Sequence, residues 1–265
     1  MRGQQPGIWI GNLARGTSTR LTFDATGAQF PVWEPDGQRV LFSSQRAGGL
    51  RNIYRQAANG IGLVERLTES PNAQVPMTIS PDGTRLVFAE NAATRLGTTS
   101  WDMMIVTLDQ EHRVRTLTET PFNEENAEIS PDGRWLAYES NDSGRDEVYV
   151  RPFPDVNSGR WLISTAGGTR PLWASNVREI FYVAPSGAVM TVPIESGSTW
   201  EAGTPVKLFD WPIPAFTGRS YDVSRNGLRF LMMKPVDASD AASAPTSLIV
   251  VQHFDEELKR LVPAK

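Results

Sequence analysis

The chain has 265 residues, and its 26 basic and 30 acidic side chains leave a formal net charge of −4 at pH 7. This mildly acidic balance does not favour a nucleic-acid or acidic-membrane partner, and the absence of cysteine excludes disulfides, zinc ribbons and thiol catalysis. No apolar run approaches the length of a membrane span, and residues 1–12 lack the apolar core of a signal peptide, so we expect a soluble chain without an export signal.

The first predicted element is a pair of strands within residues 8–22, IWIGNLARGTSTRLT. Apolar and β-branched residues flank a turn that contains glycine, which is typical of two antiparallel strands. In the units that follow, the same pattern stands in third and fourth place. We therefore interpret residues 8–22 as the end of a four-stranded unit whose first two strands are missing.

A hairpin with a Pro-Asp-Gly corner is repeated further along the chain. Its copies are VWEPDGQRVLFSS (32–44), TISPDGTRLVFAE (78–90) and EISPDGRWLAYES (128–140). Proline presets φ at the second turn position, and glycine accepts the left-handed conformation that closes the turn. The corner carboxylates Asp36, Asp82 and Asp132 are therefore predicted to bond their own turns rather than to form a joint carboxylate site.

Two weaker copies of the hairpin follow, WASNVREIFYVA (173–184) and DVSRNGLRFLMM (222–233). Val177 stands where the other corners have glycine, and Arg225 stands where they have proline. Both copies keep an apolar run behind the corner, so we expect these hairpins to form at some local cost in stability.

The five corners recur every 44 to 50 residues, and two further strand-like segments follow each of the first four hairpins. Four short antiparallel strands in such a period are typical of a propeller blade. We predict an all-β fold, a β-propeller of four-stranded antiparallel blades, as a single domain over residues 1–265. The predicted blade units are 1–22 (partial), 28–68, 74–118, 125–165, 169–209 and 219–254.

The two ends of the chain do not complete a whole number of units. The segment SLIVVQHF, 247–254, fills the third place of the last unit, so we favour six blade positions with one incomplete blade. The alternative is a five-bladed closure, in which residues 8–22 complete the last unit. Because an incomplete blade exposes unpaired strand edges, it also offers a route to a homo-oligomer.

Two long segments carry a resemblance to a known family. SPDGRWLAYESNDSGRDEVYVRPFP and GGTRPLWASNVREIFYVAPSGAVMTVPI resemble the TolB-like, WD-repeat-related β-propellers, in particular those attached behind bacterial serine/threonine protein kinases. The ending LIVVQHFDEELKRLVP is similar to the usual terminus of that group. The resemblance implies an extracytoplasmic sensor or interaction platform without chemistry of its own. It supplies no kinase activity, since the chain has no Gly-rich loop before a Val-Ala-Ile-Lys strand and no His-Arg-Asp loop.

In a propeller the first strand of each blade is innermost, so the residues just before each corner are predicted to line a central channel. The expected binding residues there are Asn126, Arg170, Arg219 and Tyr221. The two arginines would bind an anionic group or pair with nearby acids. We predict a non-catalytic module that binds a protein or peptide partner.

The alternative prediction is a metal-dependent hydrolase of lactones, esters or phosphotriesters. Its candidate metal ligands are Glu125, Asn126, Glu128 and Asp222, because carboxylate and amide oxygens suit calcium or magnesium. Glu128 and Asp222 are then the candidate catalytic residues, one of them acting as the base that activates water. Ion pairs that line a wet channel would produce the same pattern.

Serine hydrolase chemistry is not favoured by the sequence. A Ser-His-Asp triad needs a histidine near a nucleophilic serine, and the G-x-S-x-G elbow does not occur. Of the two histidines, His112 lies in the polar turn DQEHRVR and is expected to be an outer, solvated residue, whereas His253 follows an apolar strand near the C-terminus.

Overall fold

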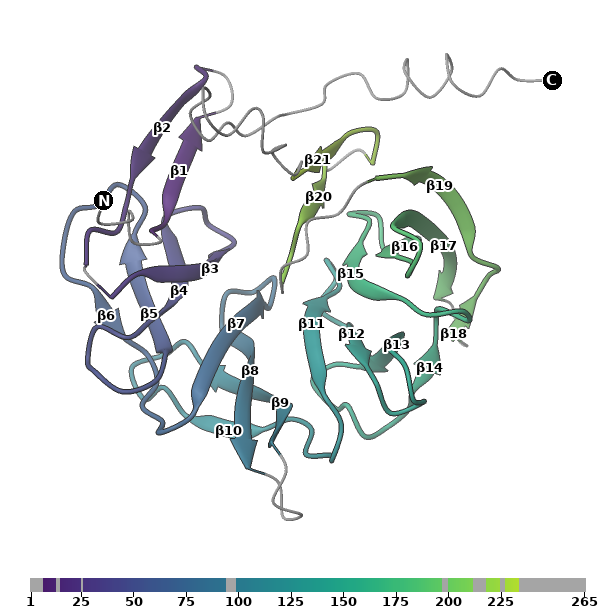
Figure 1. The fold of residues 1–265 in the computed structure, drawn as a ribbon, viewed down its shortest axis with the longest axis horizontal. Helices are drawn as coiled ribbons and strands as arrows, with labels where there is room; N and C mark the ends of the chain where they lie inside the picture. Colours follow the sequence, from purple (N-terminus) through teal and green to yellow (C-terminus); the bar gives the residue numbers. More distant parts are fainter. Residues whose placement is uncertain are drawn as a thin grey trace. The chain divides into compact units, whose positions relative to one another are not determined.

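The computed structural model describes residues 7–12, 15–24, 26–93, 99–196, 200–211, 218–224 and 227–233. All regular elements in these ranges are β-strands joined into antiparallel sheets (Figure 1), so the prediction of an all-β fold is confirmed. No helix in this part of the chain could cross a membrane. The chain forms two compact units, residues 1–129 with 140–142 and residues 130–139 with 143–265, and each is described by itself.

The first unit begins with a two-stranded sheet, β1 (Trp9–Asn12) and β2 (Thr17–Arg20). A four-stranded sheet follows in the order β3 (Ala28–Trp33), β4 (Arg39–Ser44), β5 (Asn52–Ala57) and β6 (Glu65–Arg66). The next four-stranded sheet has the order β7 (Ala73–Ile79), β8 (Arg85–Ala93), β9 (Thr99–Thr107) and β10 (Val114–Thr116). The last strand of this unit, β11 (Glu124–Ile129), lies beside β7.

The later strands follow the same order, from first to fourth within each sheet. After β11 the third four-stranded sheet continues with β12 (Trp135–Ser140), β13 (Glu147–Pro152) and β14 (Trp161–Leu162). The next sheet is β15 (Thr169–Trp173), β16 (Glu179–Val183), β17 (Ala188–Ser196) and β18 (Trp200–Ala202), with β19 (Val206–Asp210) also paired to β17. A hairpin of β20 (Tyr221–Val223) and β21 (Phe230–Met232) ends the described part, and the strand predicted at 247–254 lies outside it.

The Pro-Asp-Gly corners form the predicted turns between the first and second strands. At the β7–β8 corner the Gly83 amide donates to the Ser80 carbonyl at 2.8 Å, and the Ser80 amide donates to the Arg85 carbonyl at 2.9 Å. The Asp82 carboxylate accepts from the Ser80 hydroxyl and from the Thr84 amide, and these bonds hold the pKa of Asp82 below its ordinary value. Asp82 is therefore a turn residue, as predicted.

Gly83 tests how much the left-handed corner position contributes to stability. Its φ is +71°, and a Cβ built there would meet nothing within 4 Å, so Gly83→Ala adds backbone strain without a clash. We expect the free energy of unfolding to fall by about 1–2 kcal/mol, measured by urea denaturation. Gly83→Asn should lose clearly less, because asparagine tolerates this conformation. Equal losses in the two variants would contradict the strain argument.

A hydroxyl just after the last strand ties that strand to the strand before it in the β1–β2 sheet and in the sheets of β3–β6, β7–β10 and β11–β14. The Thr68 hydroxyl accepts from the Ile53 amide at 3.0 Å, while the Leu67 amide donates to the Ile53 carbonyl at 2.9 Å. The same pair of bonds joins Thr22 and Leu21 to Ile8, at 2.9 and 2.8 Å. The β1–β2 pair therefore makes the same pair of bonds as the third and fourth strands of the β3–β6 sheet. Later copies use Thr118 with Met103 and Ser164 with Val148.

The third-strand residue one position before this amide accepts a hydrogen bond from the loop that follows the fourth strand. The Asn52 side-chain oxygen accepts from the Ser70 amide at 3.3 Å, and Asp102 accepts from the Thr120 amide at 3.1 Å. In the sheet of β11–β14 the equivalent acceptor is Glu147, which accepts from the Gly167 amide. An amide at Asn52 and a carboxylate at Asp102 thus make the same bond, which shows that the bond does not require a charge.

Asp102 gives a prediction for the pH dependence of stability. Burial raises its pKa above the ordinary 3.8, against the Thr120 amide bond that lowers it, and the neighbouring Glu119 and Glu90 raise it further. The folded state then binds this proton more tightly than the unfolded chain, so stability falls as pH rises from 3.8 through the raised pKa.

We expect Asp102→Asn, which copies Asn52, to keep the bond to Thr120 and to remove this loss. The variant should be more stable than the wild type at pH 7, and the difference should vanish at pH 3, as measured by urea unfolding at both values. A variant that is less stable at both pH values would show that the charge itself is required.

The second unit contains one strand that the sequence pattern does not predict. β17 continues to Ser196, and its second half pairs with β18. Its first half pairs with β19. Trp200 on β18 is only 8% exposed, because its ring packs on a cluster of other tryptophans. Burial of this ring explains the additional hairpin.

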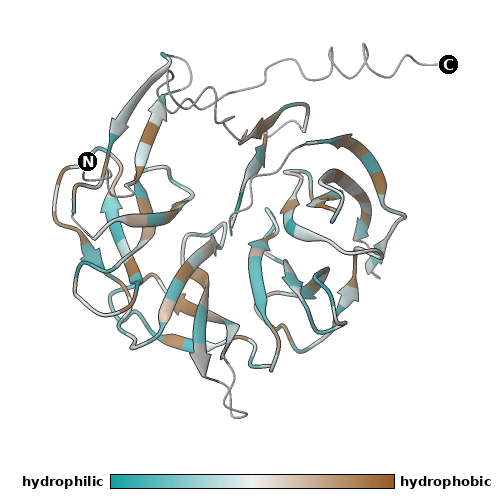
Figure 2. Cartoon of the chain, in the orientation of Figure 1, coloured by the Kyte–Doolittle hydropathy of each residue, from teal (hydrophilic) through white to brown (hydrophobic). Residues whose placement is uncertain are grey.

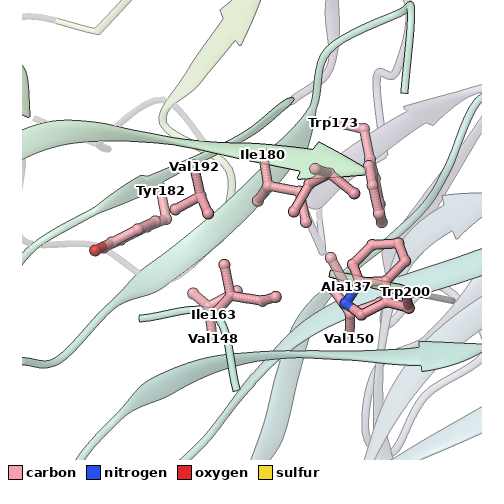
Figure 3. Close-up of a cluster of buried hydrophobic side chains, with 10 residues drawn as sticks. Ala137, Val148, Val150, Ile163, Trp173, Ile180, Tyr182, Val192 and Trp200 are labelled. Carbon is pink, nitrogen blue, oxygen red and sulfur yellow. The ribbon is translucent and has the colours of Figure 1, made fainter. Parts of the chain in front are cut away.

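The core of the second unit is built on tryptophan. The Trp200 ring lies 4.5 Å from Trp135, 5.7 Å from Trp161 and 5.9 Å from Trp173, measured between centroids. Figure 3 shows Trp173 and Trp200 at one end of a buried cluster, beside Ala137. Each large ring removes on the order of 150–250 Å² of surface from water, so the cluster is a major source of stability.

Val177 stands at the corner between β15 and β16, where the first three corners have glycine. Its φ is +60°, a conformation that costs a residue with a Cβ roughly 1–2 kcal/mol. Its amide still donates to the Ala174 carbonyl at 2.9 Å, and its side chain packs against the tryptophan cluster. The hairpin forms despite the missing glycine, as predicted, because packing offsets the backbone strain.

Candidate functional site

A β-bulge interrupts the first strand of several sheets. The register shifts between Gln29 and Val32 in β3, between Pro76 and Thr78 in β7, and between Thr169 and Leu172 in β15. At a bulge one strand carries an extra residue, whose side chain is re-aimed away from the regular alternation. Bulged first strands therefore present side chains that a regular strand would not.

Non-glycine residues occupy the left-handed region at this position. The backbone φ is +56° at Phe30, +49° at Asn126 and +54° at Arg170. Each stands six positions before the aspartate or asparagine of its corner, so the three are equivalent in the repeat. We call them the bulge residues, because Phe30 and Arg170 lie within the register shifts of β3 and β15 and Asn126 has the same backbone conformation. Strain of this kind persists where the surrounding structure enforces it, and it is concentrated at ligand-binding sites. One repeated backbone geometry thus carries an aromatic ring, an amide and a guanidinium.

β11 presents three of the predicted site residues in the first unit. Glu125, Asn126 and Glu128 are each partly buried, and Figure 2 shows β11 as a mainly hydrophilic strand. Two backbone contacts hold the strand on β7: the amides of Ala127 and Ile129 donate to Met77 Sδ and Thr78 Oγ1, each at 3.3 Å. The predicted acidic residues therefore lie together on one well-held strand.

Glu124, next to these residues, was not among the sequence candidates. It is 4% exposed, and its carboxylate accepts from the hydroxyls of Thr118 at 3.2 Å and Thr120 at 2.6 Å. Its role is to join the end of β10 to the start of β11. The repeated Leu-Thr ending of the fourth strand was the available signal, since the hydroxyl implies a partner on the following strand.

In the second unit, two of the predicted site residues, Arg170 and Tyr221, are in contact. The Tyr221 hydroxyl donates to the Arg170 carbonyl at 2.9 Å, and Arg170 Nε donates to the Gly218 carbonyl at 3.0 Å. The Arg170 amide donates to Glu139 Oε2 at 2.7 Å, and Glu139 is 9% exposed. The backbone and side chain of Arg170 are therefore fixed by contacts on three sides.

The other predicted residues of this unit are less enclosed. Arg219 and Asp222 are exposed, and the Asp222 carboxylate accepts from the amide of the adjoining Val223 at 2.8 Å. Within the described ranges, no group of three or more histidine, aspartate or glutamate side chains is arranged to hold a metal ion. The predictions of catalytic and metal-binding roles for Glu125, Asn126, Glu128 and Asp222 remain predictions.

His112 differs from its expected solvated position. Its side chain is 19% exposed, and Nε2 lies 3.5 Å from Glu65 Oε1. The same glutamate also accepts from Arg55 Nη2 at 2.8 Å. The backbone φ at His112 is +44°, in the left-handed region. His112 therefore helps to join two adjacent sheets of the first unit.

No protein-family model matches the chain. A stretch of 76 residues is 33% identical to the uncharacterized peptidase YuxL of Bacillus subtilis strain 168, and it makes up 29% of this chain and 11% of that peptidase. TolB from Acinetobacter baumannii superposes with a TM-score of 0.64 at 17% identity, over 87% of this chain and 54% of that one. An oligogalacturonate lyase in complex with manganese gives a TM-score of 0.62 at 13% identity, over 88% of this chain and 66% of that one.

At such identities the similarity concerns the fold and leaves activity open. The sheet topology supports the same fold independently, because four-stranded antiparallel sheets recur with their strands in chain order. The chain has the fold of the TolB-like β-propellers.

Proposed function

We propose that the chain is a non-catalytic binding module for a protein or peptide partner, in which each unit offers its own bulge residues, Phe30 and Asn126 in the first unit and Arg170 in the second. The observation that carries this proposal is the left-handed backbone shared by Phe30, Asn126 and Arg170. A scaffold that holds one geometry while its side chains differ can change specificity without changing fold. The TolB-like fold supports a binding role, since it requires no catalytic group.

The chemistry of the bulge residues suits a peptide. An aromatic ring such as Phe30 can anchor an apolar side chain, an amide such as Asn126 can pair with a peptide backbone, and a guanidinium can bind a carboxylate. All three residues are partly buried, so they combine a fixed position with access to solvent.

Glycine substitutions test this proposal, because glycine accepts the left-handed backbone and removes only the side chain. We expect Asn126→Gly to change the free energy of unfolding by less than about 1 kcal/mol, and Asn126→Ala to lower it by about 1–2 kcal/mol. Peptides selected on the wild-type protein from a displayed library should lose about tenfold or more in affinity for Asn126→Gly and Phe30→Gly. Enrichment of no peptide, or full affinity in both stable variants, would refute the proposal.

The metal-dependent hydrolase is the second candidate, and the manganese-bound lyase with the same fold is the observation that favours it. Asn126 and Glu128 stand two positions apart on β11, and Glu125 adjoins them, so oxygen ligands for a hard cation are present on one strand. A bound calcium or magnesium ion would polarise a substrate ester and activate water.

Metal analysis of the purified protein separates the two candidates. A hydrolase predicts a stoichiometric divalent ion and an esterase or lactonase rate that chelation abolishes and Glu128→Gln reduces. The binding module predicts peptide binding that is unchanged after chelation. Turnover that chelation abolishes, together with no enrichment of peptides either with or without added metal, would favour the hydrolase.

A further inference from the structure

Two arginines occupy the same place in the β1–β2 pair and in the β3–β6 sheet of the first unit. Arg20 and Arg66 each stand two positions before the residue whose hydroxyl bonds the preceding strand, and each Nε donates to the backbone carbonyl of that residue, at 2.8 and 3.0 Å. The other two nitrogens of Arg66 also have oxygen partners. Nη2 donates to Asn52 Oδ1 at 2.5 Å, and Nη1 lies 3.5 Å from Glu69 Oε1.

Arg20 lacks both of these side-chain partners. When the two segments are aligned on their shared hydroxyl bonds, Gly7 takes the place of Asn52. In the same alignment, Phe23 takes the place of Glu69. Within the described part of the chain, Nη1 and Nη2 of Arg20 have neither a hydrogen-bond acceptor nor an acidic partner. Two donors that the β3–β6 sheet satisfies with side-chain oxygens therefore remain open in the β1–β2 pair.

Gly7 is the reason that no side chain covers Nη2 of this arginine. A Cβ built on Gly7 would lie 3.1 Å from both Nε and Nη2 of Arg20, so a side chain at this position would contact the guanidinium directly. The sheets of β3–β6, β7–β10 and β11–β14 carry an oxygen-bearing residue here, Asn52, Asp102 and Glu147 respectively. Glycine supplies no such oxygen, which leaves the position beside Nη2 to an oxygen from another molecule.

Two exposed aromatic rings border the same guanidinium. Arg20 Cζ lies 6.0 Å from the ring centroid of Trp9 and 5.6 Å from that of Phe23, and these side chains are 54% and 76% exposed. The cation–π contacts and the Nε bond together hold the guanidinium in place. The acid that follows Phe23, Asp24, is paired with Arg46 at 2.6 Å. The surface here therefore combines an unpaired positive charge with apolar rings.

We propose that Arg20, Trp9 and Phe23 form a binding site for a carboxylate that is carried on an apolar group. The two carboxylate oxygens accept from Nη1 and Nη2, while the apolar group packs on the exposed rings. Glu69 is the precedent for the carboxylate, since it supplies that group to Arg66. The site uses none of the bulge residues, so it is a binding site in addition to that of the proposed function.

A carboxylate next to an apolar group has two sources, the C-terminus of a peptide and a free aromatic acid. N-acetylphenylalanine represents the first source and 3-phenylpropionate the second. N-acetylphenylalanine amide is the control without the charge, and acetate is the control without the ring. The Nε–H signal of Arg20, the indole N–H signal of Trp9 and the amide signal of Gly7, followed by NMR in the full chain, report binding directly. Probes this small are expected to bind with dissociation constants on the order of millimolar.

We expect at least one ring-bearing carboxylate to shift these signals and to saturate, and the tighter of the two identifies the source. Acetate should bind about fivefold or more weakly, because it makes no contact with the rings. The neutral amide should produce no saturable shift, since it lacks the charge that pairs with the guanidinium.

Three variants locate the site. Arg20→Lys should weaken binding by about tenfold or more, because an ammonium cannot make the bidentate pair. Phe23→Glu copies Glu69 at an exposed position and should abolish saturable binding, because the chain then supplies its own carboxylate. Arg66→Lys is the matched control. It changes the equivalent arginine, whose nitrogens already have partners, and should leave the dissociation constant unchanged.

Absence of a saturable shift with both ring-bearing carboxylates, or an equal response to the neutral amide, would overturn the site. Equal affinity for acetate would remove the role of the rings, and an equal loss in Arg66→Lys would indicate a diffuse charge effect; either result contradicts the proposal. These outcomes are distinct from failure of the proposed function, which is tested at Phe30 and Asn126.

Discussion

Trp200→Ala is expected to lower the free energy of unfolding by about 3–5 kcal/mol, the largest single loss that we predict. The ring contacts three other tryptophans and is 8% exposed, so its removal leaves a cavity bounded by large, rigid side chains (Figure 3). Rings cannot relax into such a space as aliphatic chains can. Urea denaturation followed by tryptophan fluorescence and circular dichroism measures the loss.

Trp200→Phe is the matched control. It keeps an aromatic ring in the cluster and removes the indole Nε1–H, which is buried and has no hydrogen-bond partner within the described part of the chain. We expect a cost below about 1.5 kcal/mol, because the volume lost is partly offset by the removal of an unpaired donor. If alanine and phenylalanine cost the same, packing of this ring does not stabilise the unit.

The corners of the repeat were predictable from sequence because their causes are local. At these corners proline fixes φ and glycine accepts the left-handed position, and the apolar run that follows specifies a strand. This is why the hairpins, their order and their four-stranded sheets were predicted correctly. Even the copy with Val177 at the corner could be recognised, since its apolar strand Glu179–Val183 remained intact.

The bulges and β18 could not be predicted in the same way. Phe30 and Arg170 have side chains that give no sign of a left-handed backbone, and the conformation is imposed by the surrounding sheet. β18 exists because Trp200 packs on rings that are distant in sequence, a tertiary cause that a local pattern does not contain. Strand periodicity predicts which side chains alternate between the two faces of a sheet, and it does not predict where a bulge breaks that alternation.

The candidate site was predictable in part for the same reason. Residues just before a corner lie on the first strand, so Asn126, Arg170 and Tyr221 could be nominated from spacing alone. The residues that hold Arg170 come from other strands. The sequence around Glu139, for example, gives no indication that its carboxylate accepts from the Arg170 amide. Likewise, the Ser220 hydroxyl, which is buried and has no hydrogen-bond partner among the described residues, can be found only once burial is known.

Glu147→Ala is expected to lower the free energy of unfolding by about 2–4 kcal/mol. Glu147 is 2% exposed, and its carboxylate accepts from the Ser164 hydroxyl, from the Gly167 amide at 3.0 Å and from Arg145 Nε at 2.6 Å. Removing it leaves a buried hydroxyl and a buried amide without an acceptor, and each such group costs about 1–3 kcal/mol. Urea unfolding of the variant measures the sum.

The size of that loss does not come mainly from the ion pair. The Arg145 side chain is 60% exposed, so it stays hydrated when its partner is removed, and Arg145→Ala should cost less than about 1 kcal/mol. Glu147→Gln should fall between the two, because its amide oxygen can still accept from Gly167 while its NH₂ group meets Ser164. Asn52 fills the equivalent place in the first sheet with an uncharged acceptor, which is the native precedent for this ranking. If Arg145→Ala were as costly as Glu147→Ala, the charge pair, and not the repeated closure of the loop after the fourth strand, would hold this sheet together.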